Sequence, residues 1–184
     1  IFGQNFYQKI PFFSISWSLC VEEHFYIFLP FFLLFLNTQN EKTKLILLGL
    51  STLVPMILRL ILIPNYDPTI FGYATTATFF RFEGLILGII ASYLIVYKNT
   101  LISKLKPYTG IIVTVNILWL ILTIKLSATF NYYFGLFIIS VLFTALVLAL
   151  YQSDTYKISK NKFISLTAVS SYSIYLTHAL VIHF

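Results

Sequence analysis

Charged residues are scarce in this sequence. They make up 10% of the 184 residues, whereas apolar residues make up 59%. A soluble domain carries about 25% charged residues, so the composition argues against an ordinary globular fold in water. The apolar residues come in long runs rather than at amphipathic spacing, and the mean hydropathy is +0.88. The chain is therefore predicted to be a membrane protein.

Cysteine is almost absent as well. Cys20 is the only one, which excludes an internal disulfide framework and a cysteine-based metal cluster, and we expect no metal site. The first residues lack the basic stretch followed by a short apolar one that marks a signal peptide. No internal repeat or low-complexity linker divides residues 1–184, so a single domain is predicted. Because the chain starts at Ile1 and stops at Phe184 inside an apolar run, we expect a piece of a longer protein.

Long apolar runs predict six helices that cross a membrane, the last of them cut short. A spanning helix needs about 20 mostly apolar residues. The candidate spans are residues 17–36, 45–63, 82–97, 108–127, 132–151 and 164–184. The third is short unless it begins near Thr78. The predicted fold class is an all-α, polytopic transmembrane helix bundle.

Basic residues lie in alternate loops of this arrangement. Eight of the twelve fall in the first, third and fifth loops, namely Lys42, Lys44, Lys98, Lys104, Lys106, Lys157, Lys160 and Lys162. Lysine-rich loops stay cytoplasmic, so these three loops are predicted to face the cytoplasm. The net charge of +6 is then a signal of topology in a multi-pass protein of the cell membrane. The expected surroundings are the lipid bilayer, and nucleic acid is not an expected partner.

The unusual ionisable residues all fall towards the outer end in this orientation. They are Glu22, Glu23, His24, Arg59, Arg81, Glu83 and His178. A charge at the centre of a span costs about 2.5–3.5 kcal/mol, and less near its edge. A random scatter of interfacial charges would be less one-sided.

The stretch SWSLCVEEHFY, residues 16–26, has two interpretations. Glu22 and Glu23 could be interfacial carboxylates at a helix N-terminus, where negative charge is favourable. Alternatively, they are buried carboxylates that pair with an arginine and titrate as a coupled pair. Ser18, Glu22 and Tyr26 share one helix face, and we expect that face to look inward towards other helices.

Arg81 and Glu83 begin the third span and are followed by Gly84 and Gly88. This glycine spacing lets helices approach closely. Arg81 is either an arginine that snorkels to the interface or a guanidinium that binds a carboxylate or a phosphate. Arg59 is expected to snorkel at the end of its helix.

The last span also has a polar face, formed by Ser171, Tyr175 and His178. A histidine one helical turn from a tyrosine can transfer protons. It can equally form an ordinary hydrogen bond inside the membrane. His183 is expected to belong to the helix terminus.

The stretch SWSLCVEEHFYIFLPFFLL resembles the signature of acyltransferase family 3. These are integral-membrane acyltransferases that O-acetylate bacterial surface and wall polysaccharides. The matching residues are Trp17, Ser18, Leu19, Glu22, Glu23, Phe25, Tyr26 and Pro30. Cys20 stands where a small residue such as serine is usual, and His24 stands where glutamine is usual.

Two later segments resemble the family in the same order. FFRFEGLILGIIASYL is similar to a helix start of the family through Thr78, Arg81 and Gly88, with Glu83 in place of aspartate. SSYSIYLTHALVI is similar to a late segment, through Ser171, Tyr172, Ser173, Tyr175, Leu176 and His178. The resemblance therefore extends over almost the whole chain.

The resemblance implies a protein of about ten helices with no bound cofactor. Acyl-CoA, most often acetyl-CoA, would supply the acyl group, and a hydroxyl of a polysaccharide or glycoside would accept it. The implied catalytic residues are Glu22, Glu23, Arg81 and His178. The implied substrate-binding or supporting residues are Trp17, Ser18, Tyr26, Glu83 and Tyr175. The family's arginine-and-histidine helix would precede residue 1.

Two other functions are compatible with these residues. In a transporter, Glu22, Glu23 and His178 would relay protons or bind a solute. The absence of inverted repeats and the position of the carboxylates near the outer edge weigh against it. A membrane partner without catalysis is the second alternative, and it would tolerate the change Glu22→Gln.

Overall fold

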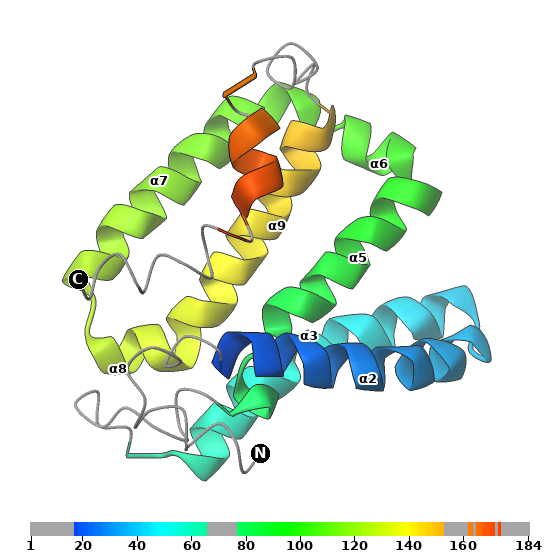
Figure 1. Cartoon of the computed structure of the whole chain (residues 1–184), viewed down its shortest axis with the longest axis vertical. Helices are drawn as coiled ribbons and strands as arrows, with labels where there is room; N and C mark the ends of the chain where they lie inside the picture. Colours follow the sequence, from blue (N-terminus) through cyan, green and yellow to red (C-terminus); the bar gives the residue numbers. More distant parts are fainter. Residues whose placement is uncertain (1–16, 66–76, 153–161, 164, 172, 174–184) are drawn as a thin grey trace.

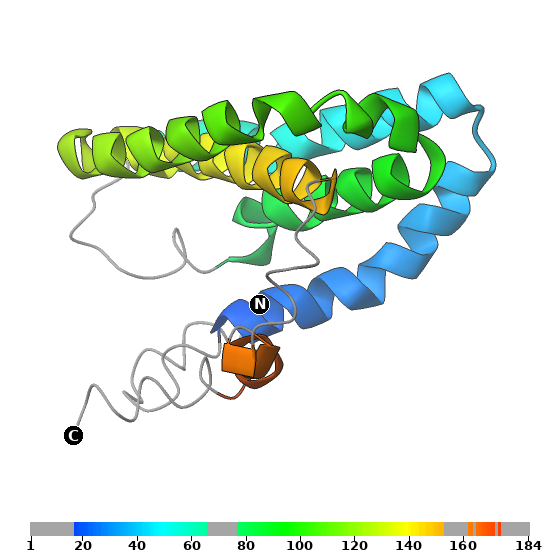
Figure 2. The same ribbon diagram turned by 90° about the horizontal axis from the view of Figure 1, so that it is seen from above.

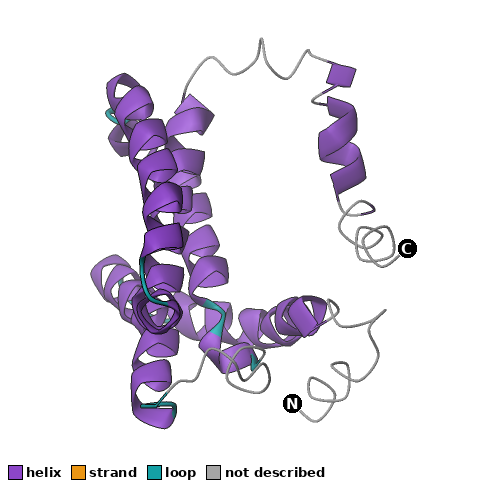
Figure 3. Ribbon diagram, turned by 90° about the vertical axis from the view of Figure 1, so that its left-hand side faces the viewer, coloured by secondary structure: helices purple, strands orange, loops and turns teal. Residues whose placement is uncertain are grey.

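The computed structural model describes residues 17–65, 77–152, 162–163, 165–171 and 173. Within these ranges every regular element is a helix, and none is a strand (Figure 3). The predicted all-α class is confirmed.

The first two helices form a hairpin. Helix α2 spans Trp17–Asn37, and α3 spans Glu41–Leu62. Asn40 caps α3, because its side-chain oxygen accepts a hydrogen bond from the Thr43 amide at 2.9 Å. This cap starts the helix at residue 41, four residues before the predicted start, although the residues it adds are mostly polar.

The third span begins with a separate short turn. A 3-10 helix, η3, covers Thr78–Phe80, and α5 follows over Glu83–Tyr97. The predicted bounds of 82–97 are thus confirmed. Thr78 belongs to this separate turn, so the turn does not lengthen the helix. After α5, the short helix α6 covers Asn99–Ser103.

Two long apolar helices complete the described core. The 3-10 turn η4 spans Lys106–Tyr108 and leads into α7, Thr109–Lys125. The short α8, Ala128–Phe130, continues as a π-helix, η5, over Asn131–Gly135. Helix α9 then spans Leu136–Gln152. The predicted spans 108–127 and 132–151 correspond to α7 and to η5 with α9.

Helices α5, α7 and α9 run alongside one another, and α9 packs against both neighbours (Figure 1). The α2–α3 hairpin crosses the end of this group at which α5 begins. From above, α2 lies beside the layer that contains the other long helices (Figure 2). Its contact with that layer is an apolar cluster of Phe25, Leu36, Leu48 and Ile86.

The glycine pair in α5 contributes unequally to packing. A Cβ atom at Gly84 would lie 3.5 Å from the Ser140 hydroxyl of α9, which is ordinary van der Waals contact. At Gly88 no atom would lie within 4 Å. The expected close approach of helices occurs at Gly84 and not at Gly88.

The described helices have the length and surface of membrane helices. Four stretches are long and apolar enough to cross a bilayer, namely Ser18–Asn37, Glu41–Leu62, Asn99–Lys125 and Ala128–Tyr151. Large apolar side chains such as Ile27, Phe31 and Ile61 are exposed on them. Exposed apolar surface of this extent suits lipid contact, so the chain is a membrane protein.

Ion pairs connect α3 and α5 at both ends. Lys98 lies 2.6 Å from the Glu41 carboxylate, and Arg59 lies 2.8 Å from the Glu83 carboxylate. The first and third loops therefore lie at one end, as the alternation of lysines predicted. The hydrogen bond that Lys98 donates to the Glu41 carboxylate raises the pKa of Lys98, which favours the charged form of this lysine.

The sixth predicted span is described only in part. Residues 162–163 and 165–171 are helical. Residue 173 is described as well, whereas residues 164, 172 and 174–184 lie outside the described residues.

Candidate functional site

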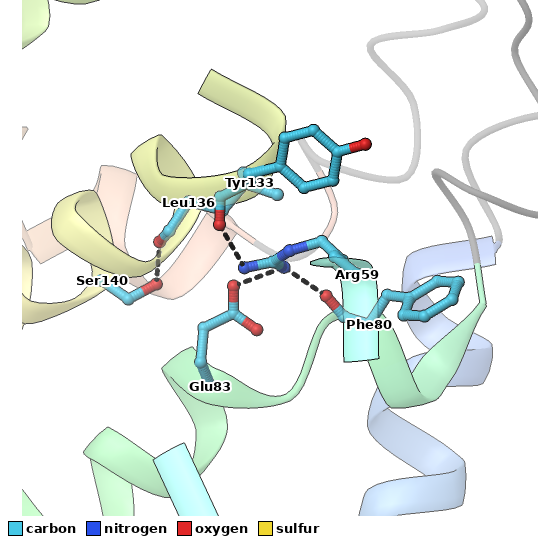
Figure 4. Close-up of polar contacts among 6 residues, drawn as sticks. All are labelled: Arg59, Phe80, Glu83, Tyr133, Leu136 and Ser140. Carbon is cyan, nitrogen blue, oxygen red and sulfur yellow. Dashed lines mark hydrogen bonds and ion pairs between the residues drawn. The ribbon is translucent and has the colours of Figure 1, made fainter. Parts of the chain in front are cut away.

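A buried ion pair occupies the end of the bundle opposite the first and third loops. Arg59, in the last turn of α3, has none of its side chain exposed, and Glu83, in the first turn of α5, is 3% exposed. Arg59 Nη1 donates to Glu83 Oε1 at 2.8 Å and to the Phe80 carbonyl at 2.5 Å (Figure 4). Arg59 Nη2 donates to the Tyr133 carbonyl at 3.4 Å. One guanidinium thus connects α3, η3, α5 and η5.

The expectation that Arg59 snorkels at a helix end is wrong. Its side chain points into the protein, where removing its charge from water costs several kcal/mol unless the charge is paired. The carboxylate that pairs with it opens the next apolar helix. An arginine and a glutamate at the facing ends of consecutive apolar helices are the signal from which this pair could have been found.

The π-helix supplies part of the arginine's surroundings. The Tyr132 ring centroid lies 5.9 Å from the Arg59 guanidinium carbon, within the range of a cation–π contact. The Tyr133 hydroxyl donates to the Ile63 carbonyl, which connects η5 to the end of α3. Single π turns inside α-helices often occur at functional sites. The sequence pattern did not predict this π turn.

The 3-10 turn η3 brings α2 into the same region. The His24 Nδ1 atom on α2 lies 2.8 Å from the Thr78 hydroxyl, at hydrogen-bond distance. An apolar cavity of about 380 Å³ adjoins this contact between α2, α3 and α5. Its walls are Phe25, Phe28, Phe32, Ser51, Val54, Phe82 and Ile86, with His24 and Thr78.

The adjacent carboxylates of Glu22 and Glu23 are not buried by the described helices. Glu22 and Glu23 are both exposed on α2. The ion pairs found within the described ranges are those of Arg59 and Lys98. Neither carboxylate is paired with Arg81 there. A pairing with an arginine elsewhere in the full-length protein stays a prediction.

The polar stripe of α2 is not the face that the described helices bury. Val21 and Phe25 are buried, whereas Glu22 and Tyr26 are exposed and Ser18 is half-buried. The expectation that this stripe faces other helices is therefore not met within the described part of the chain. Apolar side chains of α2 are buried instead, since Phe25 and Leu36 pack in the apolar cluster with α3 and α5.

Arg81 and Glu83 have separate surroundings despite their proximity in sequence. Glu83 is committed to Arg59. Arg81 follows η3 as its C-terminal residue and is half-buried. Its amide donates to the Thr78 carbonyl at 2.9 Å. The predicted residues Arg81, Thr78 and Glu83 thus lie around one turn.

Several predicted site residues cannot be compared with the structure. Tyr175 and His178 lie outside the described residues, and so does the side chain of Trp17. No group of three or more histidine, cysteine, aspartate or glutamate side chains gathers in the described part in a way that could hold a metal ion.

A second cavity, of about 940 Å³, lies at the opposite end, between α2, α3 and α5. Its polar lining includes Asn37, Glu41, Lys44, Tyr93 and Lys98. The rest of the lining is mostly leucine and proline, so the cavity is amphiphilic.

Comparison with known proteins agrees with the motifs. The profile described as "Acyltransferase domain" matches residues 3–184. Relatives from Staphylococcus aureus strains COL, N315 and Mu50 carry the provisional name O-acetyltransferase and are 28% identical to the chain. The alignments cover 98% of this chain and 32% of each relative, so the chain spans about a third of the length of these relatives. No solved structure matches the chain.

The family assignment rests on the match to the acyltransferase profile, which covers nearly all of the sequence. The chain belongs to the acyltransferase 3 family of membrane proteins.

Proposed function

We propose that the protein is a multi-pass O-acyltransferase of the cell membrane. It transfers an acyl group from acyl-CoA to a hydroxyl of a cell-surface or wall polysaccharide or of a glycoside. The proposed acyl group is acetyl. The observation that carries this proposal is the family match over residues 3–184. The provisional name of the Staphylococcus aureus relatives supports it.

The reaction makes an ester and releases a thiol. The acceptor hydroxyl attacks the thioester carbonyl and loses its proton to a base. The carbon–sulfur bond then breaks, and CoA leaves as the thiol. Such a transfer needs a proton acceptor for the hydroxyl and positive charge or donors for the oxyanion.

The site residues take roles that follow from their chemistry. Glu22 and Glu23 orient the acceptor or receive its proton, and Arg81 supplies positive charge for an anionic group. His178, with Tyr175 one turn away, transfers protons. Trp17, Ser18 and Tyr26 support the substrates, and Glu83 supports the site through its pair with Arg59. These roles concern the full-length protein, in which the rest of the chain completes the site.

The orientation assigns each substrate to a side. The loops rich in lysine face the cytoplasm, where acyl-CoA is present. The end with His24, Thr78 and Arg81 faces outward, where surface glycans are present. The thioester end of acyl-CoA therefore reaches into the bundle from the cytoplasmic side to meet the acceptor hydroxyl.

The test uses the full-length protein in membrane vesicles of both orientations. A crude surface-glycan fraction is enclosed in the vesicles as they form, and acetyl-CoA labelled in the acetyl group is supplied from outside. In inside-out vesicles, the proposal predicts release of CoA thiol and label in an alkali-sensitive ester of the glycan. Right-side-out vesicles should do neither until they are permeabilised.

A transporter would behave differently in the same vesicles. It would move solute across the membrane without consuming the thioester. If a labelled solute crosses the membrane and no CoA is released with any of several acceptors, the transporter function replaces the acyltransferase proposal.

A further inference from the structure

Arg59 lies outside the motifs that identify the family, yet its contacts reach the segment that carries one of them. Its guanidinium donates to the Phe80 carbonyl at 2.5 Å and to the Glu83 carboxylate at 2.8 Å. Phe80 is the last residue of η3, and its side chain is fully buried. The arginine therefore contacts both the end of the turn and the start of α5.

The turn η3 has little internal structure of its own. It is three residues long, and its backbone hydrogen bonds run from the Phe80 amide to Ala77 and from the Arg81 amide to Thr78. Hydrogen-bond geometry in 3-10 turns is poorer than in α-helices. A charge-assisted hydrogen bond to the Phe80 carbonyl is stronger than these neutral ones, so Arg59 adds a strong restraint to the turn.

Two side chains of interest project from this turn. The Thr78 hydroxyl meets His24 of α2 at 2.8 Å, next to Glu22 and Glu23 in sequence. Arg81 follows the turn directly. A shift of η3 would therefore move Thr78 and Arg81 together relative to α2.

We propose that Arg59 is a positioning residue for acyl transfer. Through the Phe80 carbonyl it holds the turn η3 in place, and it thereby aligns Thr78 and Arg81 with residues 22–24 of α2. Its catalytic consequence rests on the proposed function. Within the described ranges, Arg59 pairs with Glu83, and it acts on Thr78 and Arg81 through the backbone of Phe80.

The competing explanation is that the pair of Arg59 and Glu83 serves only to hold helices together. The two explanations separate in the double variant Arg59→Met/Glu83→Leu. Replacing a buried ion pair with apolar residues of similar volume often leaves folding intact. The double variant therefore removes the contact with Phe80 without leaving an unpaired buried charge.

The first readout is the alignment of α2 with η3, measured without any reaction. The substitutions His24→Cys and Thr78→Cys are introduced into the full-length protein, with Cys20→Ser, and disulfide formation is followed in membranes under a mild oxidant. With Arg59 present, the two positions should cross-link rapidly. In the double variant, the rate should fall by about tenfold, since disulfides tolerate only a narrow geometry.

The second readout is turnover per folded molecule. The double variant, with His24 and Thr78 intact, should lose about a hundredfold in kcat with little change in KM for acetyl-CoA, because a misplacement of about 1 Å costs that much. Asn116→Leu is the matched control. Asn116 also connects two helices, since its side-chain amide donates to the Leu142 carbonyl of α9 at 3.2 Å, but it lies in α7 away from η3. It should lower stability while leaving both readouts unchanged.

Each outcome decides the proposal. An unchanged cross-linking rate in the folded double variant overturns it. Slower cross-linking with wild-type kcat overturns the catalytic part. If the wild-type protein transfers no acyl group from any donor, the proposed function fails, and the cross-linking rate still decides whether Arg59 positions the turn.

Discussion

Arg59 is a full charge with none of its side chain exposed, and Glu83 is its one carboxylate partner within the described ranges. Removing one partner leaves the other charge buried, whereas removing both does not. We therefore expect Glu83→Leu to destabilise the protein by about 3–5 kcal/mol, and Arg59→Met/Glu83→Leu by less than about 1 kcal/mol. Unfolding in detergent, followed by intrinsic fluorescence, measures the difference. Equal losses in the single and double variants would contradict the assignment of a charge pair.

His24 provides a second residue-scale prediction, because glutamine is usual at this position of the resembled signature. Either side chain can exchange a hydrogen bond with the Thr78 hydroxyl, which lies 2.8 Å from His24 Nδ1. Acyl transfer should survive His24→Gln within about threefold, and His24→Leu should reduce it by about tenfold, the cost of one unmade hydrogen bond of about 1.4 kcal/mol. Loss of activity in His24→Gln would instead make the imidazole a proton acceptor in its own right.

At this scale the motifs identified residues but did not assign their partners. The motifs identified Thr78, Arg81 and Glu83, and the structure places them around one turn. The partner of Glu83 is 24 residues earlier in the chain, and nothing local distinguishes a buried arginine at a helix end from one that snorkels. Distant pairings of this kind depend on how α3 and α5 cross.

At the scale of elements, the π-helix η5 requires a residue without a side chain at Gly135. A Cβ atom at Gly135 would lie 2.9 Å from Asn131 Oδ1. Asn131 cannot move freely, because its side-chain amide donates to the Thr123 carbonyl of α7 at 2.9 Å. Gly135→Ala should therefore destabilise the protein by about 1–2 kcal/mol through the lost hydrogen bond.

Gly88→Ala is the matched comparison within another helix. No atom lies within 4 Å of its added Cβ, so the change should be neutral or stabilise the protein by up to about 1 kcal/mol through helix propensity. Thermal unfolding of the two variants in the same detergent checks both expectations. A larger loss for Gly88→Ala than for Gly135→Ala would contradict the described packing.

Elements were the most predictable level of this protein. The helix over 82–97 follows from a continuous apolar run, and the structure has it at Glu83–Tyr97. The start of α3 at Glu41 was missed because the first turn is polar, and the Asn40 cap forms it instead. The π-helix could not be expected, since no residue pattern distinguishes a π turn from continuous α-helix over 132–151.

For the whole molecule, the ion pairs at both ends of α3 and α5 place the first and third loops together. If the lysine-rich loops are cytoplasmic, a cysteine introduced at Lys44 or Lys104 should react with an impermeant maleimide only in inside-out vesicles or after permeabilisation. A cysteine at Asn65, after α3, should react only in right-side-out vesicles. The Cys20→Ser background prevents labelling of the native thiol. If the cysteines at Lys44 and Asn65 were both labelled in the same vesicle orientation, the result would contradict the topology.

The crossing of the α2–α3 hairpin over the other helices is a whole-molecule feature that spans alone do not predict (Figure 1). Apolar length determines that a helix can cross a membrane. Its angle to neighbours depends on which side chains meet, here Phe25 and Leu36 of α2 with Ile86 of α5. The same contacts leave Glu22 and Glu23 exposed on the described part, so the sequence did not predict their surroundings, and their role stays a prediction.

The most direct test of the central claim measures acyl transfer by site variants. Full-length wild-type protein and the variants Glu22→Gln, Glu23→Gln and Arg81→Ala are compared in inside-out vesicles that enclose the glycan, at equal protein level, with Lys106→Ala as the control. The label transferred from acetyl-CoA to glycan should fall by about 10²-fold or more in the three site variants, as expected when a charge that acts in the transition state is lost. The control should match the wild type. Transfer that persists at the wild-type level in all three variants would contradict the assignment of these residues to the acyl-transfer site.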